Sequence, residues 1–252
     1  MECAIIGGTG VYEAGFSKPR NVDVKTNYGT VNLDIADFGG MQIAFLARHG
    51  KNHSRPPHLV NYRANIKALQ KLGVKYVFAT FTVGSCNPKI RVGDSVILTD
   101  FIDFTKSRET TFCDEKSEFV LHTDMTDPFC RDLREKFSKA SGLKTEAVYG
   151  CTEGPRFETK AEIKMYAKLG ADVIGMTAVP EVNLAKEVGM CYAAVGLVSN
   201  MCTGMGSSNL AEDDISAAIG KAKTKALSEF IKIFQTRLNQ QNCTCKSSTL
   251  RV

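Results

Sequence analysis

Short apolar runs rich in β-branched residues alternate with segments of helical periodicity along almost the whole chain. Runs such as Val74–Phe81 and Cys191–Ser199 have the length and composition of buried strands. Val60–Leu72 and Glu212–Leu238 repeat apolar residues at helical spacing. The alternation predicts an α/β fold with a mixed central β-sheet flanked by helices on both faces. The other expected strands are Ala4–Ile6, Val31–Phe38, Gln42–Ala47, Ser95–Ile102, Thr145–Tyr149 and Asp172–Ile174, and the other expected helices are Pro128–Ser141, Lys160–Leu169 and Pro180–Val188.

The pattern runs on without a linker, an internal repeat or a low-complexity block. We therefore expect one domain over residues 1–239, because a chain of 252 residues can bury a sizeable core without disulfides or metals. Residues 240–252 are polar and are expected to form a flexible C-terminal tail. Within this tail, Cys243 and Cys245 are interpreted as exposed thiols in preference to a redox pair.

Charge and apolar runs limit the partners of the chain. The net charge is +5, and the basic residues are scattered, so no nucleic-acid surface is expected. No run reaches the ~20 apolar residues that a membrane helix needs. The first apolar run begins almost at Met1 with no basic segment before it, and the nine cysteines follow no disulfide framework. These features predict a cytoplasmic protein with free cysteines.

The glycine-rich segment from Gly7 to Gly10 follows the first expected strand. A dinucleotide-binding fingerprint would need a further glycine where Glu13 stands, and the segment after it has a poor helical pattern. Glycines also let backbone N–H groups approach an anion, and Thr9 adds a hydroxyl to this loop. An anion-binding loop, a dinucleotide site and a plain tight turn therefore stay open from these residues alone.

Arg48 and His49 follow another expected strand directly. A guanidinium presents a fork of donors that suits phosphate, and a histidine can donate to the same anion. His49 and His53 are also spaced like two zinc ligands on one helical turn, but the glutamate of that motif is missing and Gly50 disfavours a helix. We expect an anion site here and no metal site.

Two further segments make a family resemblance specific. They are Glu153–Thr159, which reads EGPRFET, and Gly175–Glu181, which reads GMTAVPE. Together with GGTG at Gly7–Gly10, RHG at Arg48–Gly50 and the start of a helix at Asn61–Ile66, they resemble the trimeric purine nucleoside phosphorylase and methylthioadenosine phosphorylase family. The resemblance extends from about Cys3 to Ser228 and implies a nucleoside phosphorylase-like sheet with a phosphate site, a ribose platform and a base pocket.

The resemblance also implies roles for single residues. The expected phosphate-binding residues are Thr9, Arg48, His49, Thr82 and Thr177. Phe81 departs from the pattern, because relatives of the methylthioadenosine type have a small hydroxyl residue there. Met176 is expected under the ribose, and His53 and His122 near the 5′ group, with His122 reaching a neighbouring subunit. A homotrimer or a hexamer is therefore implied.

Glu158 and Asn200, with Phe157 beside them, are expected to bind the base. A 6-oxopurine has a donor at N1 and an acceptor at O6, which suit a carboxylate and an amide. Adenine-specific relatives have serine and aspartate at these two positions. The pair therefore favours the 6-oxopurine-specific branch, with Asn200, His49 and Glu158 as the expected catalytic residues.

The expected activity is the phosphorolysis of inosine, guanosine or 5′-methylthioinosine in purine salvage, which releases the base and a (methylthio)ribose 1-phosphate. Phosphate is the co-substrate, and no cofactor is expected. Ile215, Ala218 and Ile219 stand where some relatives have a 5′-binding histidine, which leaves the 5′ preference open. Two alternatives remain at this point: a methylthioadenosine phosphorylase, and a dinucleotide-binding oxidoreductase built on Gly7–Gly10.

Overall fold

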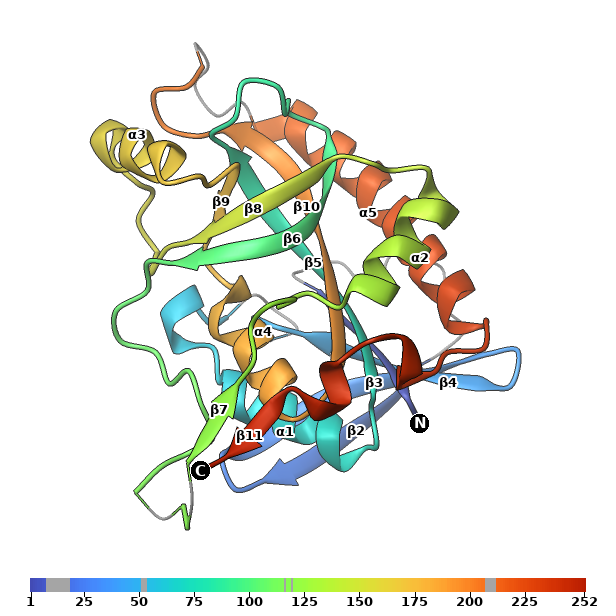
Figure 1. Cartoon of the computed structure of the whole chain (residues 1–252). Helices are drawn as coiled ribbons and strands as arrows, with labels where there is room; N and C mark the ends of the chain where they lie inside the picture. The colour runs from blue at the N-terminus through green and yellow to red at the C-terminus, as the bar shows by residue number, and fades with distance from the viewer. Residues whose placement is uncertain (8–18, 51–53, 116, 119, 207–211) are drawn as a thin grey trace.

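A mixed β-sheet forms the centre of the molecule (Figure 1). The computed structural model describes residues 1–7, 19–50, 54–115, 117–118, 120–206 and 212–252, with the backbone alone for 212–218. Within these residues, nine strands form the sheet in the order β10-β6-β8-β9-β5-β1-β4-β3-β2. Their bounds are β1 Cys3–Gly7, β2 Arg20–Thr26, β3 Gly29–Phe38, β4 Met41–Ala47, β5 Tyr76–Ser85, β6 Ser95–Asp103, β8 Glu146–Cys151, β9 Val173–Gly175 and β10 Cys191–Met201.

The sheet combines both strand directions, as the sequence predicts. β1 lies between β4 and β5 and is parallel to both. β10 runs parallel to β5 and antiparallel to β6. Since β5 also pairs with β9, and β8 joins β6 to β9, the strands β5, β10, β6, β8 and β9 close into a ring. This ring brings the ends of β5, β9 and β10 together.

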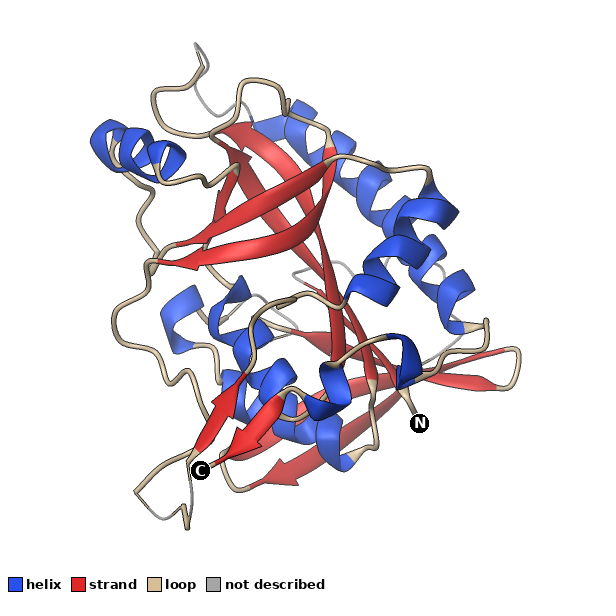
Figure 2. Cartoon of the chain, in the orientation of Figure 1, coloured by secondary structure: helices blue, strands red, loops and turns tan. Residues whose placement is uncertain are grey.

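Helices cover both faces, as predicted (Figure 2). Because neighbouring side chains of a strand point to opposite faces, Phe78 packs on one side of β5 and Val77 on the other. Phe78 stacks on Phe230 of α5 at 4.3 Å between ring centroids. The helices are α1 Tyr62–Lys71, α2 Arg131–Ser141, α3 Lys160–Lys168, α4 Ala178–Glu187 and α5 Glu212–Phe234. Within the described part of the chain, no helix has both the length and the apolar character needed to cross a membrane.

Local sequence explains how several helices begin and end. Asn61 caps α1, because its side chain accepts a hydrogen bond from the Ala64 amide. Thr159 and Glu162 form a capping box at the start of α3, directly after Glu158. α2 ends at Gly142, which adopts a left-handed conformation. These signals fix where the helices start relative to the neighbouring loops.

Three strands were missed. β2 alternates polar and apolar residues and pairs with β3 at the edge of the sheet, where few side chains are buried. β7 (Leu121–Thr123) and β11 (Thr249–Arg251) pair with each other in a separate two-stranded sheet. Strands this short carry too few residues for a periodic pattern.

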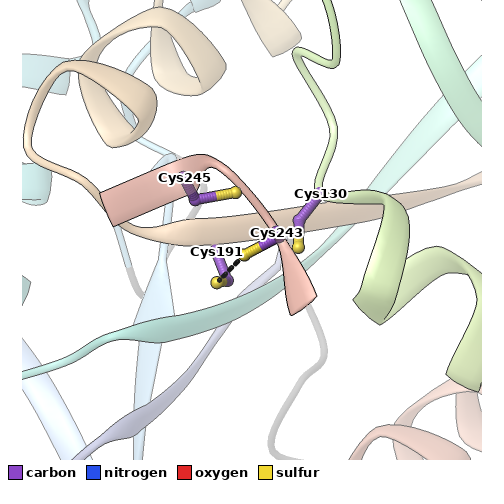
Figure 3. A group of neighbouring side chains, drawn as sticks. All are labelled: Cys130, Cys191, Cys243 and Cys245. Carbon is purple, nitrogen blue, oxygen red and sulfur yellow. Dashed lines mark hydrogen bonds between the residues drawn. The ribbon is translucent and has the colours of Figure 1, made fainter. Parts of the chain in front are cut away.

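The C-terminal segment differs from the flexible tail expected from its composition. Residues 240–242 and 245–247 form 3-10 turns, and β11 follows them. Cys245 and Ser248 are buried, and the Ser248 hydroxyl donates to the Lys186 carbonyl at 2.8 Å. Cys243 and Cys245 lie beside Cys130 and Cys191 (Figure 3). A few buried side chains and strand pairing order this segment despite its polar sequence, so the expected exposure of both thiols is wrong: Cys243 is half-buried and Cys245 buried.

Candidate active site

A cavity of about 490 Å³ opens where β4, β5, β9 and β10 end. In α/β sheets, ligands bind beyond the carboxyl ends of the strands, so this position is the expected one. Residues predicted from the sequence supply much of its lining: Arg48, His49, Thr82, Phe157, Glu158, Met176, Thr177 and Asn200. The chain thus brings the proposed anion-binding and base-reading side chains to one cavity.

The remaining predicted residues are not part of this lining. Thr9 and His53 lie outside the described residues. His122 is exposed on β7, where it pairs in register with Leu250 of β11. It therefore does not line the cavity of its own chain, and its predicted contact with a neighbouring subunit stays a prediction.

Arg48 reaches the cavity already paired with a carboxylate that sequence reasoning missed. Its Nε donates to Glu181 Oε2 at 2.6 Å and its Nη2 to Glu181 Oε1 at 2.7 Å. Its Nη1 donates to the Thr80 carbonyl at 3.2 Å, and the Tyr192 hydroxyl donates to Glu181 Oε1 at 2.7 Å. Burial is the largest single influence and lowers the pKa of Arg48, but the charge and hydrogen bonds of Glu181, with smaller contributions from Tyr192 and Tyr62, together raise the pKa above its ordinary value.

The pairing changes what Arg48 offers to an anion. A guanidinium has five N–H donors. Three of them bind Glu181 and the Thr80 carbonyl, so two remain without a partner among the described residues. The positive charge is also balanced locally. Arg48 is therefore a fixed donor with little net charge around it.

Phe81 stands where relatives of the methylthioadenosine type have a small hydroxyl residue, and the structure shows where its larger side chain lies. Its ring is buried and lies under the guanidinium carbon of Arg48, 4.3 Å from the ring centroid. Strand alternation turns the next side chain, Thr82, to the opposite side, where it is exposed. Phe81 and Thr82 both line the cavity. The aromatic ring thus supports Arg48, while Thr82 contributes to the cavity lining.

His49 is held in one orientation. Its Nδ1 lies 2.8 Å from the Arg55 carbonyl oxygen, and the ring is buried. A carbonyl can only accept, so Nδ1 carries a proton. In the neutral ring this assigns the acceptor role to Nε2, and in the charged ring both nitrogens donate. The hydrogen-bonding role of Nε2 therefore depends on the charge of the ring.

Thr177 stands at the beginning of α4. It is the N-cap residue, yet its side chain makes no capping hydrogen bond. The residue is buried and lines the cavity. The Thr177 amide donates to the Tyr149 hydroxyl at 3.2 Å and the Val179 amide to Cys151 Sγ at 3.4 Å, so the Thr177 hydroxyl is the donor that this segment can offer to an anion.

Glu158 and its neighbour Thr152 form the carboxylate end of the cavity. The Thr152 hydroxyl donates to Glu158 Oε1 at 2.6 Å, and both residues are buried. One carboxylate oxygen is thereby fixed, and the other can accept from a ligand. Phe157, in contrast, is 62% exposed and lines the edge of the cavity.

Asn200 is oriented by two neighbours. Its Nδ2 donates to the Met201 carbonyl at 3.0 Å, and its Oδ1 accepts from the Ser199 hydroxyl at 2.7 Å. Because the Met201 carbonyl can only accept a hydrogen bond, the atom of the Asn200 side-chain amide that faces it must be the nitrogen. Gly84 makes room for this arrangement: a Cβ there would lie 3.1 Å from Asn200 Nδ2 and 2.9 Å from Cys202 Sγ.

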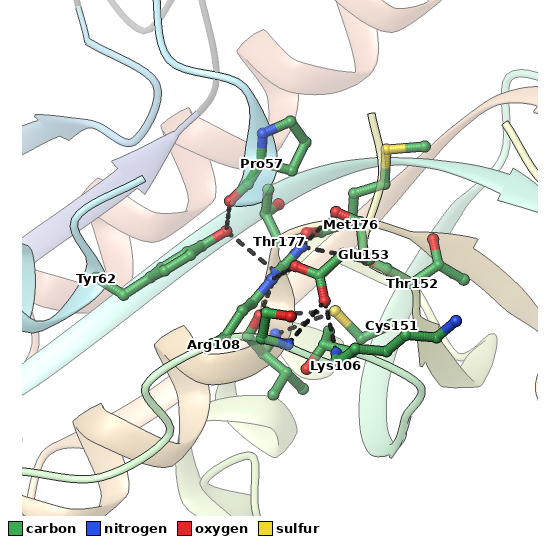
Figure 4. A network of polar contacts seen from close by, with 12 residues as sticks. Pro57, Tyr62, Lys106, Arg108, Cys151, Thr152, Glu153, Met176 and Thr177 are labelled. Carbon is green, nitrogen blue, oxygen red and sulfur yellow. Dashed lines mark hydrogen bonds and ion pairs between the residues drawn. The ribbon is translucent and has the colours of Figure 1, made fainter. Parts of the chain in front are cut away.

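Arg108 is a second residue that sequence reasoning missed, and it clamps the loops under the cavity (Figure 4). Its Nη1 donates to the Met176 carbonyl at 2.7 Å and to the Val179 carbonyl at 2.6 Å. Its Nη2 donates to the Glu153 carbonyl at 2.7 Å, and its Nε to the Glu153 carboxylate at 3.0 Å. The side chain is only 2% exposed. The segment around Arg108 contains no motif, so only the fold reveals this role.

Met176 fits tightly against the clamped loop. Gly154, with φ of +66°, passes so close that an added Cβ would lie 2.5 Å from Met176 Sδ. The backbone at Gly154 therefore packs against the Met176 thioether, which lines the cavity. α5 contributes Ile219 and Lys223 to the same lining.

Comparisons with known proteins identify the family of the chain. The Phosphorylase superfamily model matches residues 2–234. The 6-oxopurine nucleoside phosphorylase of Pyrococcus furiosus is 44% identical over 255 residues, which cover 97% of this chain and 96% of that protein. A probable S-methyl-5′-thioinosine phosphorylase of Methanothermobacter thermautotrophicus is 44% identical, with 96% of this chain and 86% of that protein covered.

Solved structures of phosphorylases have the same fold as this chain at lower sequence identity. A methylthioadenosine phosphorylase from an antarctic soil metagenomic library superposes with a TM-score of 0.88 at 31% identity, covering 98% of this chain and 90% of that one. The methylthioadenosine phosphorylase of Schistosoma mansoni, in complex with adenine, gives 0.88 at 29% identity, with 98% and 96% covered. With the superfamily match extending over residues 2–234 and relatives 44% identical along nearly their whole length, the chain belongs to the phosphorylase superfamily.

Proposed function

We propose that the protein catalyses the phosphorolysis of 6-oxopurine nucleosides, releasing the free base and a ribose 1-phosphate. The observation that carries the proposal is that Arg48, His49 and Thr177 line the same cavity as Glu158 and Asn200. Relatives named as 6-oxopurine nucleoside and S-methyl-5′-thioinosine phosphorylases support the same reaction. The substrates are a purine nucleoside and inorganic phosphate, and no organic cofactor is required.

Phosphate binds at the end of the cavity formed by Arg48, His49, Thr82 and Thr177. The two remaining N–H groups of Arg48 and the two hydroxyls donate to its oxygens. The charge of the ring sets the role of His49. When the ring is neutral, Nε2 accepts a hydrogen bond from the O–H group of a phosphate monoanion, and when the ring is charged, Nε2 donates to a phosphate dianion. Thr9, from the glycine loop, is proposed to complete this set.

The base binds between Glu158 and Asn200. The unshared oxygen of Glu158 accepts from N1–H of a 6-oxopurine, and the remaining N–H of Asn200 donates to O6 or N7. An adenine would place its N1 acceptor against the carboxylate, which leaves buried polar groups unpaired. Phe157 packs over the base, and Met176 lies under the ribose.

In the reaction, a phosphate oxygen bonds to the anomeric carbon while the bond from that carbon to N9 breaks. The electron pair of this bond goes to the purine, and positive charge builds up on the ribose ring. Asn200 stabilises the negative charge as it appears on the purine, so its contact strengthens towards the transition state. The purine then takes up a proton and leaves.

The 5′ preference and the assembly are part of the proposal. Ile219 offers an apolar contact at the α5 end of the cavity, which suits a methylthio group, and Lys223 lies beside it. Ile215 and Ala218 lie outside the described side chains. We propose a homotrimer or a hexamer in which His122 of one protomer covers the cavity of another, and light scattering on the purified protein measures this state directly.

One assay tests the activity. Purified protein is given inosine, guanosine, 5′-methylthioinosine, adenosine and 5′-methylthioadenosine, each with and without phosphate, and free base is measured by chromatography. We expect phosphate-dependent release from the 6-oxopurine nucleosides. Turnover confined to the adenosine compounds would establish a methylthioadenosine phosphorylase instead. The oxidoreductase alternative loses its support, because the superfamily match includes the glycine loop on which it depended.

A further inference from the structure

Four cysteines from three distant parts of the chain meet at one point (Figure 3). Cys130 is the N-cap residue of α2, and Cys191 is the first residue of β10. Cys243 and Cys245 come from the C-terminal segment. The four Sγ atoms all lie within 4.8 Å of one another. None of these residues lines the cavity described above.

The spacing of the sulfurs suits a tetrahedral metal ion. A zinc ion bound by four thiolates at ~2.3 Å holds its sulfurs about 3.8 Å apart. The distance from Cys191 Sγ to Cys243 Sγ is 3.4 Å, and all other pairs fall below the 4.8 Å limit. Small side-chain movements are therefore enough to place all four sulfurs around one ion.

Burial also suits a structural metal site. Cys130, Cys191 and Cys245 are buried, and Cys243 is half-buried. Metals bind the thiolate, so each ligand loses its proton as the ion binds.

We propose that Cys130, Cys191, Cys243 and Cys245 form a structural binding site for a thiophilic divalent metal ion, with Zn²⁺ as the expected occupant. Each thiol that is still protonated releases its proton to solvent as its sulfur binds the metal. Sulfur fills all four positions, so no position is left for a substrate or water, which is typical of structural zinc sites.

The proposed site lies apart from the proposed catalytic centre. Cys191 begins β10 and Asn200 lies near its end, so the strand separates them by roughly 30 Å at ~3.3 Å per residue. A metal here would join α2, the start of β10 and the C-terminal segment. The inference therefore concerns stability, and it stands whether or not the proposed function is correct.

Disulfides are the competing chemistry. Cys191 and Cys243 could join only if an oxidant removed two electrons and two protons, and a second bridge between Cys130 and Cys245 would need the same again. Two separate disulfides would not require one pair of sulfurs to lie against the other pair. The mutual approach of all four sulfurs therefore favours one shared ion.

The test uses the full chain, with any affinity tag removed, purified under reducing conditions from cells grown with zinc. Plasma mass spectrometry is expected to find about one zinc per chain, and the Cys243→Ser/Cys245→Ser variant less than about a tenth of that. The control variant Cys3→Ser/Cys113→Ser, at two cysteines outside the cluster, should keep its zinc. Loss of zinc from both variants alike would contradict the proposal.

A second measurement does not depend on whether the variants fold. Metal-free wild-type protein titrated with Co²⁺ should develop the sulfur-to-cobalt charge-transfer absorption and the visible bands of a tetrahedral site, saturating near one equivalent. Two results would overturn the proposal. One is the absence of these bands with four free thiols at the cluster. The other is a non-reduced mass about 4 Da below the fully reduced mass, which indicates two disulfides.

Discussion

Arg48 and Glu181 form a two-armed ion pair in which the side chains are 2% and 0% exposed. The two residues are 133 positions apart, and the pair joins the end of β4 to the first turn of α4. It holds the guanidinium rigidly over Phe81 at the edge of the cavity. Arg48 is thus oriented before any ligand arrives, and an anion does not have to order it.

Replacing Glu181 with glutamine should destabilise the fold strongly. The change leaves the charge of Arg48 buried without a counter-charge, which typically costs about 3–5 kcal/mol. Urea unfolding at neutral pH measures this loss. The control is Glu2→Gln, which removes the carboxylate of an exposed pair with Lys75 and should cost less than about 1 kcal/mol. Equal losses in both variants would show that the buried pair is not a main contributor to stability.

Replacing Asn200 with aspartate should shift the base preference. The carboxylate cannot donate to O6 of a 6-oxopurine, and it repels the negative charge that forms on the leaving base. The ratio of kcat/KM for inosine to that for adenosine should fall about 10²-fold or more, as measured from initial rates. Asn239→Asp is the control, because this exposed side chain only accepts a hydrogen bond from the Gln241 amide, which aspartate can also do. An unchanged ratio in Asn200→Asp would refute the assigned role of Asn200.

Adding one methyl group at Gly84 should displace the Asn200 side chain. The new Cβ would lie 3.1 Å from Asn200 Nδ2 and 2.9 Å from Cys202 Sγ, so these side chains must move. A displacement of this size can cost about 10²-fold in kcat. Gly220→Ala is the matched control, since nothing lies within 4 Å of its added Cβ. It should keep full activity and, in a helix, gain about 0.5–1 kcal/mol of stability.

Glu162 should contribute to the pH dependence of stability. The hydrogen bond from Arg156, together with that from the Thr159 amide, lowers the pKa of Glu162 from its ordinary value of 4.5 to about 2. Because the pKa is lowered on folding, the stabilisation is present above pH 4.5 and is lost as the pH falls towards 2. Thermal unfolding at several pH values should therefore show a shallower decline over this range for Glu162→Gln than for the wild type. Identical slopes would contradict this assignment.

Much of the sheet and part of the site could be predicted because both depend on local sequence. Apolar runs such as Cys191–Ser199 are long enough to identify buried strands, and polar residues placed directly after them, such as Arg48, fall at strand ends. The family motifs then assigned Glu158 and Asn200, which do line the cavity. The edge strand β2 could not be identified in this way, since it buries little.

The partners of the predicted residues could not be found from sequence. Glu181 lies inside a matched motif, yet nothing local indicates that Arg48 binds it. The same holds for Ser199 and Thr152, whose hydroxyls orient Asn200 and Glu158. Such contacts arise only when distant segments fold together, and the meeting of four cysteines from three segments is of this kind.

Arg108 provides the most direct test of whether these supporting residues matter. Its planar fork donates to the Met176 and Val179 carbonyls on one side and to Glu153 on the other. Lysine keeps the charge but presents a single ammonium group, which cannot reach all these acceptors at once. The loops that carry Met176 and Thr177 should then lose their fixed positions.

We expect Arg108→Lys to lower kcat/KM for inosine about 10²-fold, because the ribose and phosphate contacts are misplaced by a fraction of a bond length or more. A positioning role also predicts that KM for phosphate rises while the protein stays folded by circular dichroism. Arg156→Lys is the control, because this exposed arginine pairs with Glu162 outside the cavity. If Arg108→Lys loses activity only in proportion to its unfolded fraction, the clamp serves stability alone and does not position the substrates.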